Sequence, residues 1–158
     1  MREILFRGKA VDADKWIYGD LRHISDGHGG YILCIVDNTS GRNNDVTGIE
    51  VSPNTVGQYT GMTDKNSTKI FERDIVRYGD TIHEVVFEQR NGTAYFGLVY
   101  SESETLPFGH YQDLRQIEVI GNIYDTPELL KGAMKPAATD VAQSGLAPAT
   151  ENFSLQEA

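Results

Sequence analysis

The chain predicts a mostly-β fold that contains a small SH3-like β-barrel, additional β-hairpins and a minor helix. Its 158 residues include 16 Gly against 5 Pro, which indicates many tight turns. Short runs of apolar, β-branched and aromatic residues recur between these turns at intervals of roughly 8–12 residues, as in a sandwich or barrel. Asn91-Gly92, the strongest short-range hairpin signal, lies between two such runs.

The first half of the chain predicts hairpins. A short strand over 2–8 and an aromatic-rich strand over 16–21 are typical of one hairpin. The most apolar run, 31–36, favours a central strand buried on both faces. Its cysteine, Cys34, is the only one in the chain and has apolar neighbours, so we expect a buried structural thiol. The polar segment 37–47 predicts a mobile loop.

The barrel is expected over residues 68–124. The runs 81–88 and 94–100 flank the Asn91-Gly92 turn and predict a second hairpin. The run 117–124 is expected to close the sheet.

A short helix is expected to begin at Thr126. Thr is a good N-cap residue, Pro127 suits the first helical position, and the charge of Glu128 favours the helix dipole. Residues 1–131 are therefore expected to form one β-rich domain. Residues 132–158 are rich in Ala, Gly, Pro, Ser and Thr and predict a flexible or disordered C-terminal tail.

Charge restricts the class of partner. The chain has 23 acidic and 14 basic residues, which give a formal net charge of −9. Its Lys and Arg residues are scattered singly along the sequence. Binding to nucleic acid or to an anionic membrane is therefore disfavoured, and basic proteins or cationic ligands suit the charge better. No apolar run approaches the ~18–20 residues that span a bilayer, and the N-terminus lacks an apolar signal-peptide core. These observations predict a cytoplasmic protein.

Three carboxylates form the first candidate site. Asp64, Glu72 and Asp74 could converge to bind Mg²⁺ or Mn²⁺ and activate water for phosphodiester cleavage. The alternative is structural, because Asp64-Lys65-Asn66 is typical of a turn whose side chains bond its own backbone. No histidine motif with local metal-ligand spacing supports the metal hypothesis.

A second candidate site is the segment Gln58-Tyr59-Thr60. Tyr59 offers a flat apolar ring with a polar tip, and its neighbours Gln58 and Thr60 offer hydrogen bonds. Such a segment could form one wall of a ligand pocket or a protein interface. The alternative is a tyrosine that closes one end of the barrel above a tight turn at Gly61.

Three separated stretches of sequence resemble a known family. They comprise 2–9 with 16–19, then 55–66 running into 70–72 and 74–76, and finally 119–130. In this order and spacing they resemble the YopX family over residues 1–131. The resemblance implies a β-rich fold, a bacteriophage or prophage origin, and expression in the cytoplasm of the bacterial host. It supplies no established activity, catalytic residue or cofactor.

The chain departs from the family pattern at two turns. The family usually has glycines near Ser67 and at the position of Arg73, just before Asp74. If those glycines serve positive-φ turns, the chain is expected to turn differently at both places.

Together these observations predict a phage-encoded accessory binding module that has no cofactor and performs no chemistry. Its partner would be a host or phage protein or a small ligand, contacted through Gln58, Tyr59, Thr60 and the three carboxylates. The prediction is compatible with a homo-oligomer. The alternative is a divalent-metal-dependent hydrolase or nuclease that uses Asp64, Glu72 and Asp74.

Overall fold

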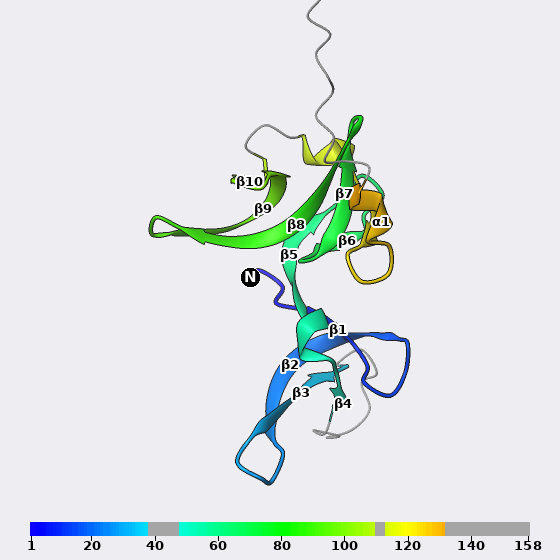
Figure 1. Ribbon diagram of the computed structural model, residues 1–158, viewed down its shortest axis with the longest axis vertical. Coiled ribbons are helices and arrows are strands. Elements are labelled where there is room, and N and C mark those ends of the chain that lie inside the picture. The colour runs from blue at the N-terminus through cyan, green and yellow to red at the C-terminus, as the bar shows by residue number, and fades with distance from the viewer. Residues whose placement is uncertain (38–47, 110–112, 132–158) are drawn as a thin grey trace, which may run out of the picture.

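The structure is a computed structural model that describes residues 1–37, 48–109 and 113–131. These residues form two antiparallel sheets and one short helix, which confirms the mostly-β prediction (Figure 1). The predicted tail at 132–158 and nearly all of the predicted loop at 37–47 lie outside the described residues. No described helix is long and apolar enough to cross a membrane.

The first sheet has six strands in the order β4-β3-β2-β1-β5-β6. The predicted hairpin at its centre is confirmed, with Arg7 of β1 opposite Tyr18 of β2. Its apolar core gathers Ala10, Ile17, Ile35 and Val51. The strands are β1 (Phe6–Lys9), β2 (Trp16–Ser25), β3 (Tyr31–Val36), β4 (Ile49–Glu50), β5 (Gly57–Thr63) and β6 (Lys69–Phe71).

The second sheet has five strands in the order β10-β9-β8-β7-β11. Its β8–β9 hairpin turns at Asn91 and Gly92, whose φ values of 51° and 78° confirm the predicted hairpin turn. Val76, Val85, Leu98 and Ile117 pack with Ile70 of β6 in the larger core cluster. The strands are β7 (Asp74–Tyr78), β8 (Thr81–Arg90), β9 (Thr93–Ser101), β10 (Glu104–Pro107) and β11 (Ile117–Asn122).

The prediction that residues 68–124 close into an SH3-like barrel is wrong. Within the described residues, the five strands from β7 to β11 form an open sheet whose edges, β10 and β11, do not pair with each other. The strand β6 leaves this group and pairs with β5 in the first sheet. A tight turn between β6 and β7, in which Asp74 Oδ2 accepts a hydrogen bond from the Phe71 N–H at 2.8 Å, carries the chain from one sheet to the other. Turn spacing cannot distinguish a closed barrel from two open sheets, because both use short strands and tight turns.

The strand β3 has the predicted bounds but not the predicted burial. Its adjacent residues Cys34 and Ile35 are 2% and 0% exposed, whereas Tyr31 at its start is 72% exposed. Ile35 packs with Ala10, Ile17 and Val51 in the core of this sheet, and only Cys34 and Ile35 of β3 pair with the short strand β4. The thiol of Cys34 is a buried core group, as predicted, and burial raises its pKa.

The segment after β11 contains the predicted helix, α1 (Glu128–Lys131), which is a single turn. Thr126 does not cap it with its side chain. Its hydroxyl instead accepts a hydrogen bond from the Asn122 N–H and donates one to the Asn122 carbonyl, both at 3.2 Å. The described residues also contain two 3₁₀ segments, η1 (Pro53–Thr55) and η2 (Leu114–Gln116).

Two turns adopt left-handed backbone conformations without glycine. Ser67 and Arg73 have φ values of 65° and 67°. The expectation that the chain turns differently at these positions is therefore wrong, because non-glycine residues hold the positive φ. The left-handed conformation of an L-residue raises the free energy of the folded state by roughly 1–2 kcal/mol per residue.

Replacing Ser67 with glycine is expected to stabilise the fold by about 0.5 kcal/mol. The relief of left-handed strain exceeds the extra entropy that glycine gives the unfolded chain. The free energy of unfolding in urea provides the measurement. The matched control is Ser103→Gly, because Ser103 also lies in an exposed turn but is not among the residues with positive φ. We expect that control to be neutral or destabilising, and equal effects of the two changes would contradict the prediction.

Candidate functional site

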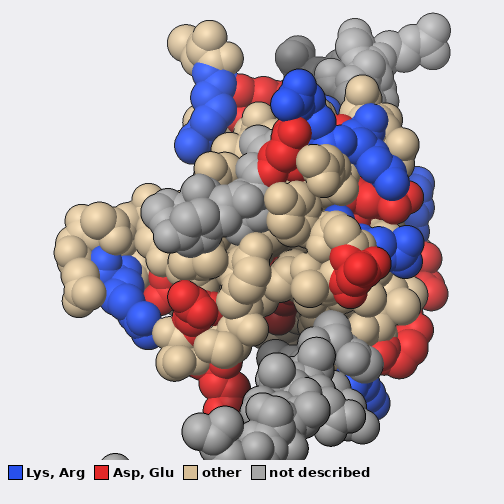
Figure 2. All heavy atoms as spheres, turned by 90° about the horizontal axis from the view of Figure 1, so that it is seen from above, with Lys and Arg blue, Asp and Glu red and all other residues tan. Residues whose placement is uncertain are grey.

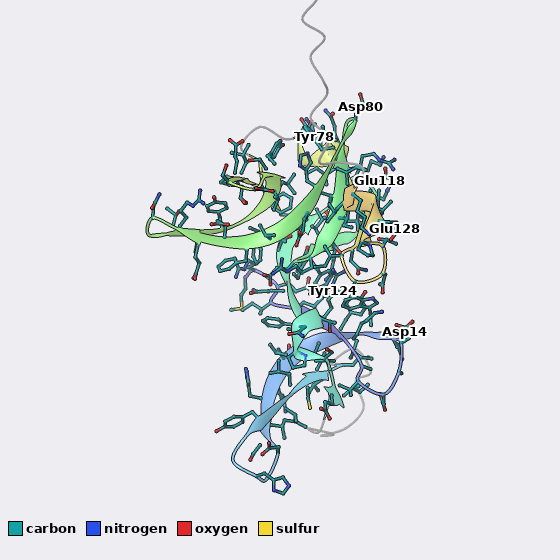
Figure 3. All side chains as sticks on the ribbon, viewed as in Figure 1. Asp14, Tyr78, Asp80, Glu118, Tyr124 and Glu128 are labelled. Atoms are coloured by element: carbon teal, nitrogen blue, oxygen red, sulfur yellow. The ribbon has the colours of Figure 1, made fainter. Side chains whose placement is uncertain are left out.

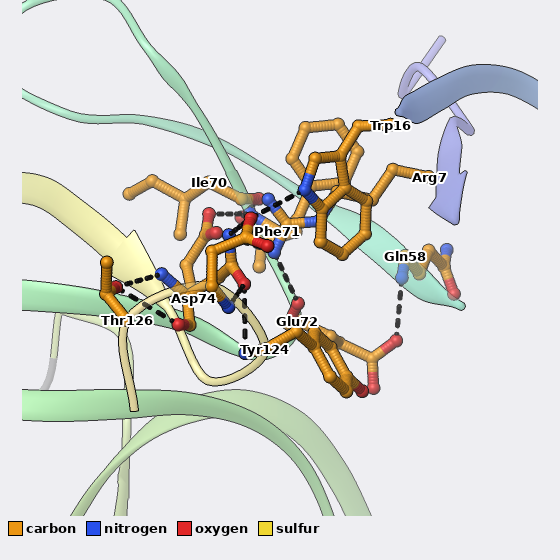
Figure 4. A network of polar contacts seen from close by, with 12 residues as sticks. Arg7, Trp16, Gln58, Ile70, Phe71, Glu72, Asp74, Tyr124 and Thr126 are labelled. Carbon is orange, nitrogen blue, oxygen red and sulfur yellow. Dashed lines mark hydrogen bonds and ion pairs between the residues drawn. The ribbon is translucent and has the colours of Figure 1, made fainter. Parts of the chain in front are cut away.

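A buried ion pair joins the two sheets. Arg7 of β1 and Asp74, the first residue of β7, lie with Nη2 and Oδ1 2.6 Å apart, and their side chains are 7% and 1% exposed. Asp74 Oδ1 contacts Arg7 as an ion pair but accepts no hydrogen bond from the described residues. Asp74 Oδ2 accepts the Phe71 N–H. Arg7 Nη2 also donates to the Glu72 carbonyl at 3.1 Å. Arg7 of the first sheet therefore fixes the turn through which the chain passes from β6 to β7 in the second sheet (Figure 4).

Aromatic rings enclose the Arg7 guanidinium. Its central carbon lies 4.7 Å from the ring centroid of Trp16 and 5.0 Å from that of Phe71. Such cation–π contacts suit the guanidinium, which is planar and weakly hydrated. The Arg7 Nε has no hydrogen-bond partner in the part of the chain that the structure describes.

Asp125 holds Trp16 in place from the segment after β11. Its Oδ2 accepts hydrogen bonds from Trp16 Nε1 at 2.7 Å and from Asn122 Nδ2 at 2.8 Å. Its Oδ1 lies 2.6 Å from Lys9 Nζ. Next to it, Tyr124 lies at the junction of the two sheets (Figure 3) and donates its hydroxyl proton to the Asn54 carbonyl. The junction is thus held by contacts from both sheets.

The acid stability of this junction depends on the Asp125 carboxylate. Partial burial raises its pKa, but the hydrogen bonds from Lys9, Asn122 and Trp16 outweigh burial and lower it to about 2. The carboxylate therefore stabilises the fold above about pH 4, and this contribution is lost as the pH falls through 2. Since its side chain is 37% exposed, solvent screening reduces the contribution to about 1 kcal/mol.

We therefore expect Asp125→Asn to lower the free energy of unfolding by about 1 kcal/mol at pH 7 and by about half as much at pH 3. Urea titrations of both proteins at the two pH values give the difference. Asp14→Asn is the control, because Asp14 also contacts Lys9 but its side chain is 88% exposed. If Asp125→Asn lost the same free energy of unfolding at both pH values, the role of the ionised Asp125 carboxylate would be contradicted.

An open cleft of about 750 Å³ lies beside the ion pair, between the two sheets. Arg7 and Asp74 contribute to its lining, and Tyr18 and Phe71 supply aromatic surface with ring centroids 5.6 Å apart. Leu5 adds apolar surface from the N-terminal segment. Volumes of 300–1,000 Å³ with mostly apolar walls and few polar groups are typical of small-molecule sites.

The predicted residues Gln58, Tyr59 and Thr60 lie next to this cleft but do not line it. Tyr59 is 6% exposed, and its ring packs against that of Phe71 at a centroid distance of 5.5 Å. The Thr60 hydroxyl donates to the Ile70 carbonyl at 2.9 Å. The backbone N–H of Gln58 donates to Glu72 Oε2 at 2.8 Å. This segment supports the wall of the cleft from behind.

The three predicted carboxylates have separate partners. Asp64 accepts three backbone N–H groups, Glu72 accepts the Gln58 N–H, and Asp74 pairs with Arg7. Among the described residues, no three His, Cys, Asp or Glu side chains are grouped so that they could hold a metal ion. Of the predicted site residues, only Asp74 lines the cleft.

Sequence reasoning missed Arg7, Trp16, Tyr18 and Asp125. A signal was present, because all four lie in stretches that carry the family resemblance. An arginine amid the apolar residues Leu5 and Phe6 of a strand also indicates a buried charge that needs a partner. The identity of that partner depends on the pairing of distant strands.

The fold and the cleft define a small two-sheet β protein with a ligand-sized cavity at the junction of its sheets. The chain belongs to the YopX family, whose model, described as "YopX protein", matches residues 5–131. The crystal structure of protein EF1440 from Enterococcus faecalis is similar at 23% sequence identity and a TM-score of 0.48, covering 82% of this chain and 99% of that one. The search of curated proteins finds no match.

Proposed function

We propose that this protein is a phage-encoded accessory binding module whose cleft between the sheets receives a small ligand or a side chain of a host protein. The observation that carries the proposal is the cleft of about 750 Å³, with aromatic walls and a buried ion pair beside them. Binding sites of this size typically bury most of a small ligand and use a few fixed polar groups for orientation.

The rigidity of the cleft supports a binding role. The Arg7 side chain is fixed by an ion pair to Asp74 and by the rings of Trp16 and Phe71. Trp16 is fixed in turn by Asp125. A site whose side chains are already ordered loses less entropy when a ligand binds. The described side chains around the cleft therefore offer a preformed surface.

Nucleic acid is not the partner that the surface charge favours. On the face seen from above, the described Lys and Arg side chains lie among Asp and Glu side chains (Figure 2). With a net charge of −9, the chain repels phosphate backbones at long range. No specific observation favours the metal-dependent hydrolase or nuclease either, since the described carboxylates are not grouped around a common point.

Affinity capture from a lysate of the bacterial host tests the proposal. Wild-type protein and a Tyr18→Ala variant serve as baits, and mass spectrometry identifies the retained proteins and small molecules. Tyr18 lines the cleft and is 44% exposed, so its truncation should leave the fold intact. The matched control is Tyr31→Ala, because Tyr31 is 72% exposed and does not line the cleft.

The expected result is a ligand or protein that the wild type and the Tyr31→Ala control retain and the Tyr18→Ala variant loses. A partner retained equally by all three baits would show binding elsewhere on the surface and would contradict the role of the cleft. Turnover of a retained small molecule by the wild type would contradict a purely binding role.

A further inference from the structure

The charges that line the cleft restrict the ligand. Three acidic residues and two basic residues contribute to the lining: Glu3, Asp20 and Asp74, with Arg7 and Lys69. Both basic groups already face carboxylates, since Arg7 lies 2.6 Å from Asp74 and Lys69 lies 2.5 Å from Glu3. Among the described residues of the lining, an anionic ligand would therefore find no cation without a carboxylate partner. It would also be repelled by the net charge of −9.

The apolar part of the lining is suited to a ring. Phe71 is 3% exposed, and Tyr18 packs against it edge-on with an interplanar angle of 64°. Tyr18 is itself 44% exposed, so part of its ring surface remains accessible from the cleft. Aromatic pairs favour offset-stacked or edge-on contacts, and a tyrosine face also attracts a positive charge.

From these two features we infer that the cleft binds a small molecule with an aromatic ring and no negative charge. The ring packs against Tyr18, and a neutral or cationic substituent suits a cleft whose two cations already face carboxylates in a chain of net charge −9. Phosphates, nucleotides and carboxylic acids are disfavoured as a class. This inference rests on the proposed function and narrows it by the chemistry of the ligand.

Three probes with the same ring and different charge test the inference: indole, tryptamine and indole-3-acetate. Each is titrated into the full chain at low ionic strength, and backbone amide shifts are followed by NMR. Gly19 and Gly121 line the cleft and report binding there, and Gly92 in the β8–β9 turn is the reference. We expect indole and tryptamine to shift Gly19 and Gly121, with indole-3-acetate at least about tenfold weaker than tryptamine.

Two further arms separate the contributions of the ring and the charge. Tyr18→Ala should weaken indole and tryptamine by about fivefold or more, while Tyr31→Ala leaves both unchanged. Raising the salt to about 0.5 M should reduce the preference for tryptamine over indole-3-acetate. Equal or tighter binding of indole-3-acetate would overturn the inference, as would the absence of shifts at Gly19 and Gly121 with all three probes. A lysate partner that depends on Tyr18 would leave the proposed function standing in that case.

Discussion

Replacing Arg7 with methionine is expected to lower the free energy of unfolding by about 3–5 kcal/mol at pH 7. Methionine keeps the unbranched apolar stem, but it removes the positive charge that faces Asp74, whose side chain is 1% exposed. A buried carboxylate without a partner keeps its full desolvation cost. Urea unfolding followed by circular dichroism gives the difference.

The control for this change is Arg77→Met. Arg77 is 52% exposed and lies 3.9 Å from Glu118, so its loss should change stability by less than about 0.5 kcal/mol. A deficit below about 1 kcal/mol for Arg7→Met would contradict the assigned role of the buried pair.

The deficit of Arg7→Met should narrow as the pH falls. Burial raises the pKa of Asp74 in the native protein, and the Arg7 guanidinium opposes that rise. Without Arg7 the pKa rises further, so the native carboxyl binds a proton more tightly than the unfolded one does. Lowering the pH from 7 to about 4.5 then stabilises the variant relative to the wild type.

The double variant Arg7→Met/Asp74→Asn provides an independent check. Asparagine removes the unpaired charge and keeps an oxygen that can accept the Phe71 N–H. We expect the double variant to be more stable than Arg7→Met by about 1–2 kcal/mol at pH 7. Additive losses would show that the two side chains do not act as a pair.

The hairpins of this fold could be predicted from sequence because their signals are local. Asn91-Gly92 fixes the β8–β9 turn, and the aromatic run at Trp16 follows β1 closely enough to pair with it. The arrangement of the hairpins could not be predicted in the same way. Whether β6 pairs with β5 or joins the second sheet depends on the turn at Arg73, which has a positive φ. Because the residue there is not glycine, the sequence gives no sign of this turn.

The candidate site was predictable only in part, for a similar reason. A carboxylate such as Asp74 is visible in the sequence, but its role depends on which residue faces it. The residue that faces Asp74 is Arg7, from a strand of the other sheet, and that pairing turns a candidate metal ligand into half of a buried ion pair. The cleft beside it is likewise built from segments that only the tertiary fold brings together.

Asp64→Ala is the second change with a large expected effect, a loss of about 3 kcal/mol of unfolding free energy. Asp64 is 6% exposed, and its Oδ1 accepts the N–H groups of Asn66 and Thr68, both at 2.8 Å. Its Oδ2 accepts the Val119 N–H of β11 at 2.9 Å, which ties the β5–β6 turn to the second sheet. Truncation leaves three backbone donors without their acceptor.

The stability of Asp64→Ala also distinguishes the structural role of this carboxylate from the metal hypothesis. Burial raises the pKa of Asp64, but the N–H groups of Val119, Thr68 and Asn66 outweigh it and lower the pKa, so the native fold favours the ionised form. A carboxylate held with others for a cation would repel its neighbours in the metal-free protein, and its removal would be neutral or stabilising. Differential scanning calorimetry should therefore show a lower melting temperature for Asp64→Ala than for the control Asp80→Ala, whose side chain is exposed in the β7–β8 turn. A rise in the wild-type melting temperature with Mn²⁺ or Mg²⁺ that Asp64→Ala abolishes would favour the metal site instead.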